Sequence, residues 1–118
     1  MKKVVTMQTI EKITEEELQA IADNSFGDMV KAVVDIAKEI VMIDAELHAD
    51  IEQVMLENGS NQEDLWGINI YPEGFENGIV EFDSLINIRP WQKNRSRYVE
   101  DENIRRRIIE IVEQKISA

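Results

Sequence analysis

The sequence predicts an α+β fold in which an antiparallel sheet of about five strands carries three helices on one face. Three observations predict it. Short runs of β-branched and apolar residues recur along the chain, as in strands. Thr14 and Asp101 are capping residues placed before helical patterns. The runs follow the order β-α-ββ-α-ββ-α within 118 residues, which is typical of one domain over residues 1–118.

The first strand is predicted at residues 3–10, a β-branched run. Thr14 follows as a helix N-cap, and Glu17 stands three residues later, where it completes a capping box. Residues 24–27 end this helix with Gly27.

Residues 29–36 and 40–48 predict a hairpin that turns at residues 37–39. From Val41 to Ile51, apolar and other residues alternate without interruption, and a period of two is the period of a strand. Asp50 is then the predicted N-cap of a short helix that ends at Gly59.

In the second half of the chain, residues 65–71 predict a strand that stops at Pro72. Residues 73–78 form a hairpin loop, in which Asn77 and Gly78 supply the left-handed backbone. Residues 79–89 predict the returning strand. A loop follows at 90–100, and Asp101 begins a final amphipathic helix.

Charge is distributed unevenly. The net charge is −11, yet every arginine lies between Arg89 and Arg107. Residues 39–88 contain twelve carboxylates and no lysine or arginine. Guanidinium groups match carboxylate and phosphate geometry, so the basic segment is a candidate anion site. It is nearly as consistent with neutralisation of the protein's own acidic half.

Composition excludes several classes of function. The negative net charge opposes binding to duplex DNA, because phosphate contacts dominate that affinity. There is no cysteine for a disulfide, a thiolate metal site or a nucleophile. No apolar run is long enough to cross a membrane, and no signal peptide is recognisable, so a cytoplasmic protein is expected.

His48 is the only histidine and the candidate general acid or base, because the ordinary pKa of histidine lies near neutrality. Asp50 or Asp83 would orient it. A metal ion held by His48 with Glu46 and Asp83 is a weaker interpretation, since no metal-binding motif occurs, and no metal ligand is assigned. A hydrogen-bonded structural histidine is the alternative.

Candidate ligand-binding residues lie on the outward positions of the later strands and in the loop that follows them. This loop combines basic side chains with Trp91 and Tyr98, a mixture that recognises a phosphate and a stackable ring, as in nucleotides. An ordered loop paired with the acidic sheet is the alternative. The candidates are Asn69, Tyr71, Asn87, Arg89, Asn94, Arg95 and Arg97.

Three runs resemble a small prokaryotic family that is catalogued as a domain of unknown function. They are residues 46–50, 59–72 and 81–90, followed by 94–97. The resemblance covers about residues 14–116 and implies a stand-alone domain without a known activity. It also implies glycine in the tight turn where this chain has Glu39, and again near Asp44 and Ala45. The second departure argues against Asp44 as a ligand.

The sequence therefore favours a domain that binds an anionic, phosphate-bearing ligand or nucleotide between the arginine-rich loop and the polar face of the sheet. Whether it is also a hydrolase stays open, and no cofactor is assigned. The alternative is a non-catalytic module that forms a homodimer or docks a partner protein, with Trp91 or Phe75 as its anchor.

Overall fold

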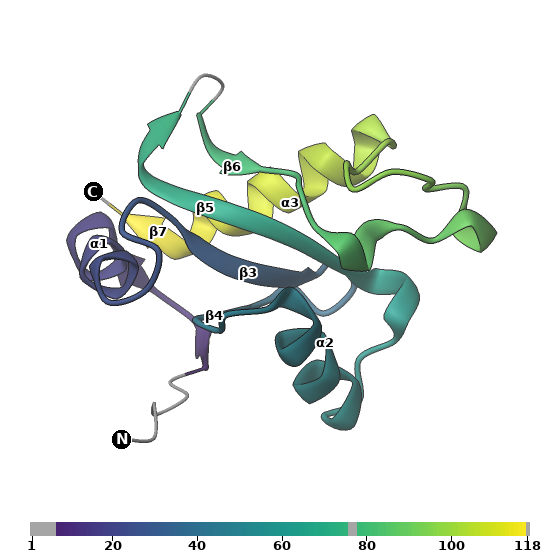
Figure 1. Ribbon diagram of the computed structural model, residues 1–118, viewed down its shortest axis with the longest axis horizontal. Helices are drawn as coiled ribbons and strands as arrows, with labels where there is room; N and C mark the ends of the chain where they lie inside the picture. The colour runs from purple at the N-terminus through teal and green to yellow at the C-terminus, as the bar shows by residue number, and fades with distance from the viewer. Residues whose placement is uncertain (1–6, 76–77, 118) are drawn as a thin grey trace.

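A computed structural model describes residues 7–75 and 78–117, without the side chain of Phe75. Its strands are β1 (Gln8–Ile10), β2 (Ile13–Thr14), β3 (Val30–Asp35), β4 (Ile40–Ile43), β5 (Leu65–Phe75), β6 (Gly78–Glu81) and β7 (Ile116–Ser117). Its α-helices are α1 (Glu15–Asp23), α2 (His48–Glu57) and α3 (Glu102–Lys115). In the described residues, the order of the main elements is the predicted β-α-ββ-α-ββ-α, and the fold is α+β (Figure 1).

Five strands form one antiparallel sheet in the order β1-β4-β3-β5-β6. β3 lies at its centre, whereas β1 and β6 are the edge strands. The two-residue strands β2 and β7 pair separately and in parallel, with Ile13 opposite Ile116. This small pairing ties the end of α3 to the start of α1, and no local sequence signal predicts it.

The predicted helix caps are present. The Thr14 hydroxyl accepts from the backbone N–H of Glu17 at 3.0 Å, and the Glu17 carboxylate accepts from the backbone N–H of Thr14 at 3.1 Å. Asp101 caps α3 by accepting from Asn103 N at 2.8 Å. These bonds span two or three residues, which is why the sequence alone reveals them.

The three helices were expected on one face of the sheet, but the structure places them on both faces. Leu18 of α1 and Ile108 of α3 belong to a core with Val34 and Trp66. Ile51 of α2 instead packs with Val33 and Leu65. Because neighbouring residues of a strand face opposite sides, α2 covers the other face. Figure 1 shows α3 passing behind the strands.

The predicted strand 40–48 ends at Ile43, and α2 begins at His48. Asp44 has a φ of 75°, which breaks the extended backbone. The alternation that predicted a longer strand was misleading, since Leu47 is exposed and Ile51 is buried in a helix. Glu39 also has a positive φ, 57°, in the predicted turn. Both positions are ones where the family resemblance implies glycine, the residue that adopts this backbone most easily.

The other boundaries differ less. β5 continues through Pro72 to Phe75, and Gly78 has the expected positive φ of 115°. Asn77 of the predicted turn, and residues 3–6 of the predicted first strand, lie outside the described residues. The strand predicted at 79–89 ends at Glu81, and a 3₁₀ turn at Leu85–Asn87 follows. None of the described helices is both long and apolar enough to cross a membrane.

Candidate functional site

Arg89 was expected on the outward face of a strand, but its side chain is only 1% exposed. Its guanidinium donates to the backbone carbonyls of Gln62 and, at 2.7 Å, Leu65, and it lies 4.3 Å above the ring of Trp66. Burial lowers the pKa of Arg89, and the carboxylate of Glu52 opposes that shift. Both Nη atoms of Arg89 donate to backbone carbonyls, and the side chain is buried. Arg89 is therefore a structural anchor.

Asn87 and Asn94 are buried as well, and both brace the backbone. The Asn87 amide accepts from Gly67 N at 2.8 Å and donates to Gly67 O at 2.9 Å. It therefore takes the place of a neighbouring strand beside β5, which explains why β6 ends early. The Asn94 amide donates to the carbonyls of Asn87 and Tyr98 and accepts from Glu100 N. Both side chains organise the loop and have no spare polar atom for a ligand.

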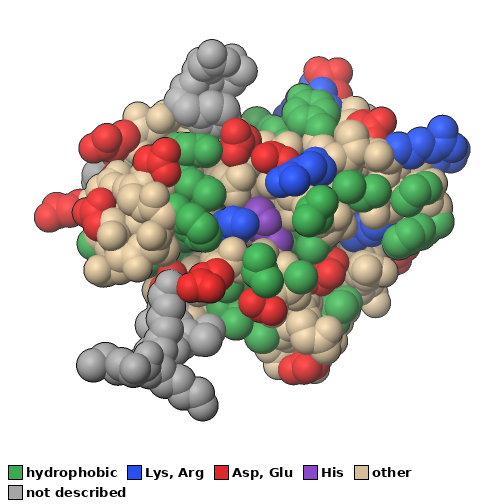
Figure 2. All heavy atoms as spheres, viewed as in Figure 1, with side chains coloured by type: hydrophobic (Ala, Val, Ile, Leu, Met, Phe, Trp, Pro, Cys, Tyr) green, Lys and Arg blue, Asp and Glu red, His purple; other side chains and the backbone are tan. Residues whose placement is uncertain are grey.

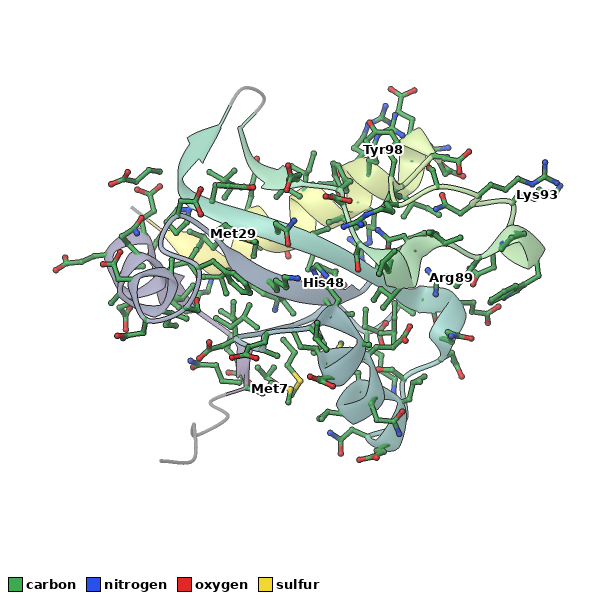
Figure 3. The ribbon with its side chains drawn as sticks, in the orientation of Figure 1. Met7, Met29, His48, Arg89, Lys93 and Tyr98 are labelled. Carbon is green, nitrogen blue, oxygen red and sulfur yellow. The ribbon has the colours of Figure 1, made fainter. Side chains whose placement is uncertain are left out.

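Residues 84–98 consequently form a firmly held loop. Arg89 N donates to Asn94 O at 2.7 Å, and Asn94 N donates to Arg89 O at 3.2 Å. The carboxylate of Glu100 accepts from the backbone N–H groups of Arg95 and Ser96, and the first of these bonds lowers the pKa of Glu100. Figure 3 shows Lys93 at the far end of this loop and Arg89 beneath it.

Arg97 differs from Arg89 in burial and in bonding. Its Nε donates to Asp83 Oδ1 at 2.6 Å, and the two side chains are 54% and 44% exposed. Nη1 and Nη2 of Arg97 have no hydrogen-bond partner among the residues that the structure describes. Asp83 thus holds one edge of the guanidinium in place while the other edge faces outward.

The polar face of the sheet contains the remaining predicted ligand residues, Asn69 and Tyr71. Asn69 lies between Lys31 of β3 and Glu81 of β6 in the strand register. Glu81 Oε1 accepts from Asn69 Nδ2 at 2.8 Å and from the Tyr71 hydroxyl at 3.1 Å. Burial, followed by the bond to Glu81, raises the pKa of Tyr71. Asn69 and Tyr71 therefore hold Glu81, and Asn69 Oδ1 is buried without a partner among the described residues.

His48 lies at the start of α2 and points to the centre of this face (Figure 3). Its Nε2 is 2.7 Å from Ile68 O, and since a carbonyl only accepts, Nε2 carries a proton. Burial lowers the pKa of His48 to about 4, with Lys31 and Arg97 adding to the shift while the Ile68 bond and Asp83 oppose it. The imidazole is therefore neutral at neutral pH. Figure 2 shows it between basic side chains on two sides.

Asp50 is not among the groups that shift the pKa of His48, and it does not cap α2, whose N-cap is Leu47. It lies two residues after His48 in the first turn, where its carboxylate is exposed and complements the helix dipole. Asp83 is the carboxylate that affects the pKa of His48. Within residues 7–75 and 78–117, no group of three or more His, Cys, Asp or Glu side chains is arranged to hold a metal ion.

A groove of about 750 Å³ runs along the outer side of β6. Its walls are β6 with Phe82 and Asp83, the loop at Ser96–Tyr98, and one side of α3. Phe82 and Tyr98 pack edge to face at 6.0 Å, and Ile109 of α3 is partly exposed beside them. Arg97 lines this groove, and of the described residues that line it, Arg97 alone is basic.

Asp83 and Arg97, two of the predicted site residues, thus pair directly in the structure. Asn69 and Asn87 contact this pair through the backbone, since Asn69 donates to Asp83 O at 3.4 Å and Asn87 donates to Arg97 O at 2.9 Å. Arg95 is exposed and does not line the groove. The missed residues are Lys31, Tyr98 as a groove wall, Ile109 and Glu113. They come from elements far apart in sequence, and no local pattern connects α3 with β6.

Comparison with known proteins identifies a family but no activity. No curated protein and no solved structure matches the chain. Residues 7–115, nearly the whole chain, match the family described as a protein of unknown function (DUF5674). The expected resemblance to a domain of unknown function is therefore confirmed: the chain belongs to the DUF5674 family.

Proposed function

We propose that this domain binds a small anionic group, a carboxylate or a phosphate, through Arg97 at one end of the groove beside β6. The proposal rests on the hydrogen bonding of the Arg97 guanidinium. Asp83 bonds to Nε at 2.6 Å, and the Nη edge faces outward without a partner among the described residues. An arginine fork held in one orientation loses little entropy when it binds a planar or tetrahedral oxyanion.

The other arginines of the segment support this choice by contrast. Arg89 is enclosed by backbone carbonyls and the Trp66 ring. Arg105 donates to Val99 O and Glu100 O, while Arg106 and Arg107 pair with carboxylates. Arg95 is exposed but lies outside the groove. Arg97 combines a fixed orientation, open donors and a cavity.

The proposal is for binding, and it assigns no acid or base role to His48. A group with a pKa of about 4 is almost entirely unprotonated at neutral pH and is a weak base. Its Nε2 proton is also engaged by Ile68 O at 2.7 Å. In this proposal His48 supports the polar face next to Asp83, and the positive charge in the groove comes from Arg97.

Titration by two-dimensional amide NMR tests the proposal. Sodium acetate and sodium phosphate, each compared with chloride at matched ionic strength, should shift the Nε–H signal of Arg97 and the amides of Phe82 and Ser96. Arg97→Gln should remove these shifts. Arg95→Gln is the matched control, since it removes the same charge from the same loop outside the groove, and it should keep them.

Two results would contradict the proposal. One is the absence of any shift beyond the chloride control with both anions. The other is an equal loss of binding in Arg95→Gln and Arg97→Gln, which would indicate diffuse attraction to the basic segment rather than a site.

A second candidate function is docking of a protein partner or a second copy, and one observation favours it. Trp91 is 71% exposed on the firmly held loop, and Leu85 of the same loop is exposed too. Exposed tryptophan on a rigid support is typical of interface anchors. Sedimentation velocity over a range of concentrations tests the homodimer: self-association that Trp91→Ser abolishes would favour it, and a concentration-independent monomer would contradict it.

A further inference from the structure

The outer edge of β6 is open to another strand. β6 is last in the sheet order and pairs with β5 on one side only. Among the described residues, no backbone bond joins residues 78–83 to an element other than β5. The groove follows the same stretch, from Gly78 to Asp83. An unpaired edge beside a groove is the arrangement in which an extended peptide adds to a sheet.

This edge is closed at one end, and the closing residue is Arg97. Ser84 N donates to Arg97 O at 3.1 Å, and the Asn87 amide holds the same carbonyl at 2.9 Å. The backbone of the loop therefore occupies the position that an added strand would need beside Ser84. A strand that lies along residues 78–83 must end there, next to the outward edge of the Arg97 guanidinium.

The charges along the groove differ between its two ends. At the closed end Arg97 pairs with Asp83 through Nε alone, and its Nη1 and Nη2 donors have no partner among the described residues. Away from this end, the groove is lined by Glu81 of β6 and Glu113 of α3. Between them lie the apolar side chains of Phe82, Tyr98 and Ile109. The groove therefore complements a negative terminus, an apolar side chain next to it, and basic side chains further back.

We propose that the groove binds the C-terminal end of an extended peptide from a partner protein. The terminal carboxylate bonds to Nη1 and Nη2 of Arg97, and the peptide backbone pairs with β6. Because the carboxylate lies at the Asp83 end, the peptide runs parallel to β6. The six-residue edge accommodates about four or five residues at roughly 3.3 Å each. This inference rests on the anion site proposed above and names its ligand.

A second copy of this chain is a poor occupant of the same edge. Pairing two β6 strands would bring Glu81 and Glu113 of one copy against those of the other, and each copy carries a net charge of −11. Like charges across a partly desolvated interface oppose association. A basic peptide meets no such opposition.

The test uses a synthetic array of acetylated pentapeptides with free C-terminal carboxylates, and the same sequences as C-terminal amides. The last residue is Val, Ile, Leu or Phe, and the earlier positions are varied over all residue types. The full chain is the probe, and hits are measured again by fluorescence anisotropy. Bound peptides should carry Lys or Arg before the last residue and lose on the order of tenfold or more in affinity when amidated.

Variants locate the peptide on the protein. Arg97→Gln should weaken binding to the level of the amidated peptide, and Arg95→Gln should leave it unchanged. Glu113→Lys should reverse the preference from basic to acidic residues upstream of the carboxylate. Hydrogen exchange should show new protection of amides within residues 79–82 on binding, which simple surface attraction would not produce.

The outcomes separate this inference from the anion site. If acetate or phosphate shifts Arg97 while no peptide of the array binds, or amides bind as well as acids, the anion site stands and the peptide inference is wrong. If neither the anions nor the peptides perturb Arg97, both are wrong. Binding without protection of residues 79–82 would also overturn the pairing with β6.

Discussion

Arg89 and Arg97 lie eight positions apart in one loop, and they illustrate two different uses of a guanidinium. Arg89 is 1% exposed and donates to backbone carbonyls beneath the loop. Arg97 is 54% exposed and shares only its Nε edge with Asp83. Arginines that cluster in sequence therefore need not cluster in space, and charge alone does not identify a binding arginine: its orientation, its unbonded donors and an adjoining cavity do.

The largest effect is expected at the buried arginine. Arg89→Met should lower the free energy of unfolding by about 3 to 5 kcal/mol, because it leaves the carbonyls of Gln62 and Leu65 unpaired and Glu52 without its counter-charge. Urea denaturation measures the change. Arg95→Met, on the same loop but exposed, is the control and should stay within roughly 0.5 kcal/mol of wild type. Similar values for the two variants would contradict the anchor role of Arg89.

The pH dependence of stability tests whether His48 behaves as a buried group like Arg89. Its pKa is about 4 in the folded protein and 6.5 in the unfolded chain, so the unfolded chain binds the proton more tightly. Its contribution is therefore complete above pH 6.5 and is lost as the pH falls toward 4. The loss is about 2 kcal/mol by pH 5 and about 3 kcal/mol below pH 4.

Comparison with His48→Gln isolates this effect. The Gln amide can donate to Ile68 O as the imidazole does, but it does not titrate. The difference in unfolding free energy between the two proteins should change in favour of His48→Gln as the pH falls from 7 to about 5. The carboxylates titrate in both proteins and cancel. A constant difference across this range would show that His48 is not desolvated.

Tight packing around the anchored part of the loop predicts a smaller effect. A Cβ at Gly67 would lie 2.5 Å from Ser84 Oγ and 2.6 Å from Ser84 Cβ. Gly67→Ala should therefore cost about 1 to 3 kcal/mol in thermal or urea unfolding. Adding Ser84→Gly should recover part of that loss, since it removes the contacting atoms. If the double variant were no more stable than Gly67→Ala, contact with the Ser84 side chain would not be the cause of the destabilisation.

The smallest effect on stability is expected at the exposed arginine. Arg97→Gln breaks an ion pair whose partners are 54% and 44% exposed, so the free energy of unfolding should fall by less than about 1 kcal/mol. Urea denaturation measures this directly. If Arg97→Gln lowered the free energy of unfolding as much as Arg89→Met, the two arginines would not differ as described. Arg97 would then be an internal counter-ion of Asp83.

Some site residues could be predicted from sequence and others could not. The pairing of Arg97 with Asp83 was within reach, because both were candidate site residues and the loop was considered as a partner of the acidic sheet. The burial of Asn87 and Arg89 was not, since it depends on the bend after Glu81 and on Gly67. Alternation alone cannot show where a strand stops.

The features that could be predicted from the sequence alone are local ones. The capping box of Thr14 and Glu17, the cap at Asp101 and the hairpin turn at residues 37–39 depend on bonds and backbone angles within a few residues. The order of helices and strands follows from such signals. Each of these local features can be predicted because the interacting groups are neighbours in the chain.

Three features depend on contacts between distant elements: the face that α2 covers, the position of His48, and the arginine that lines the groove. The contacts responsible join residues far apart: His48 with Ile68 O, Arg89 with Leu65 O, and Arg97 O with Ser84 N. Burial of a polar group costs free energy unless the group is hydrogen-bonded in the folded protein. The hydrogen-bond partners of these groups belong to other helices, strands and loops. A pattern in the sequence does not contain that information. Arg89 and Arg97 therefore cannot be distinguished from the sequence, although one is buried and the other lines the groove.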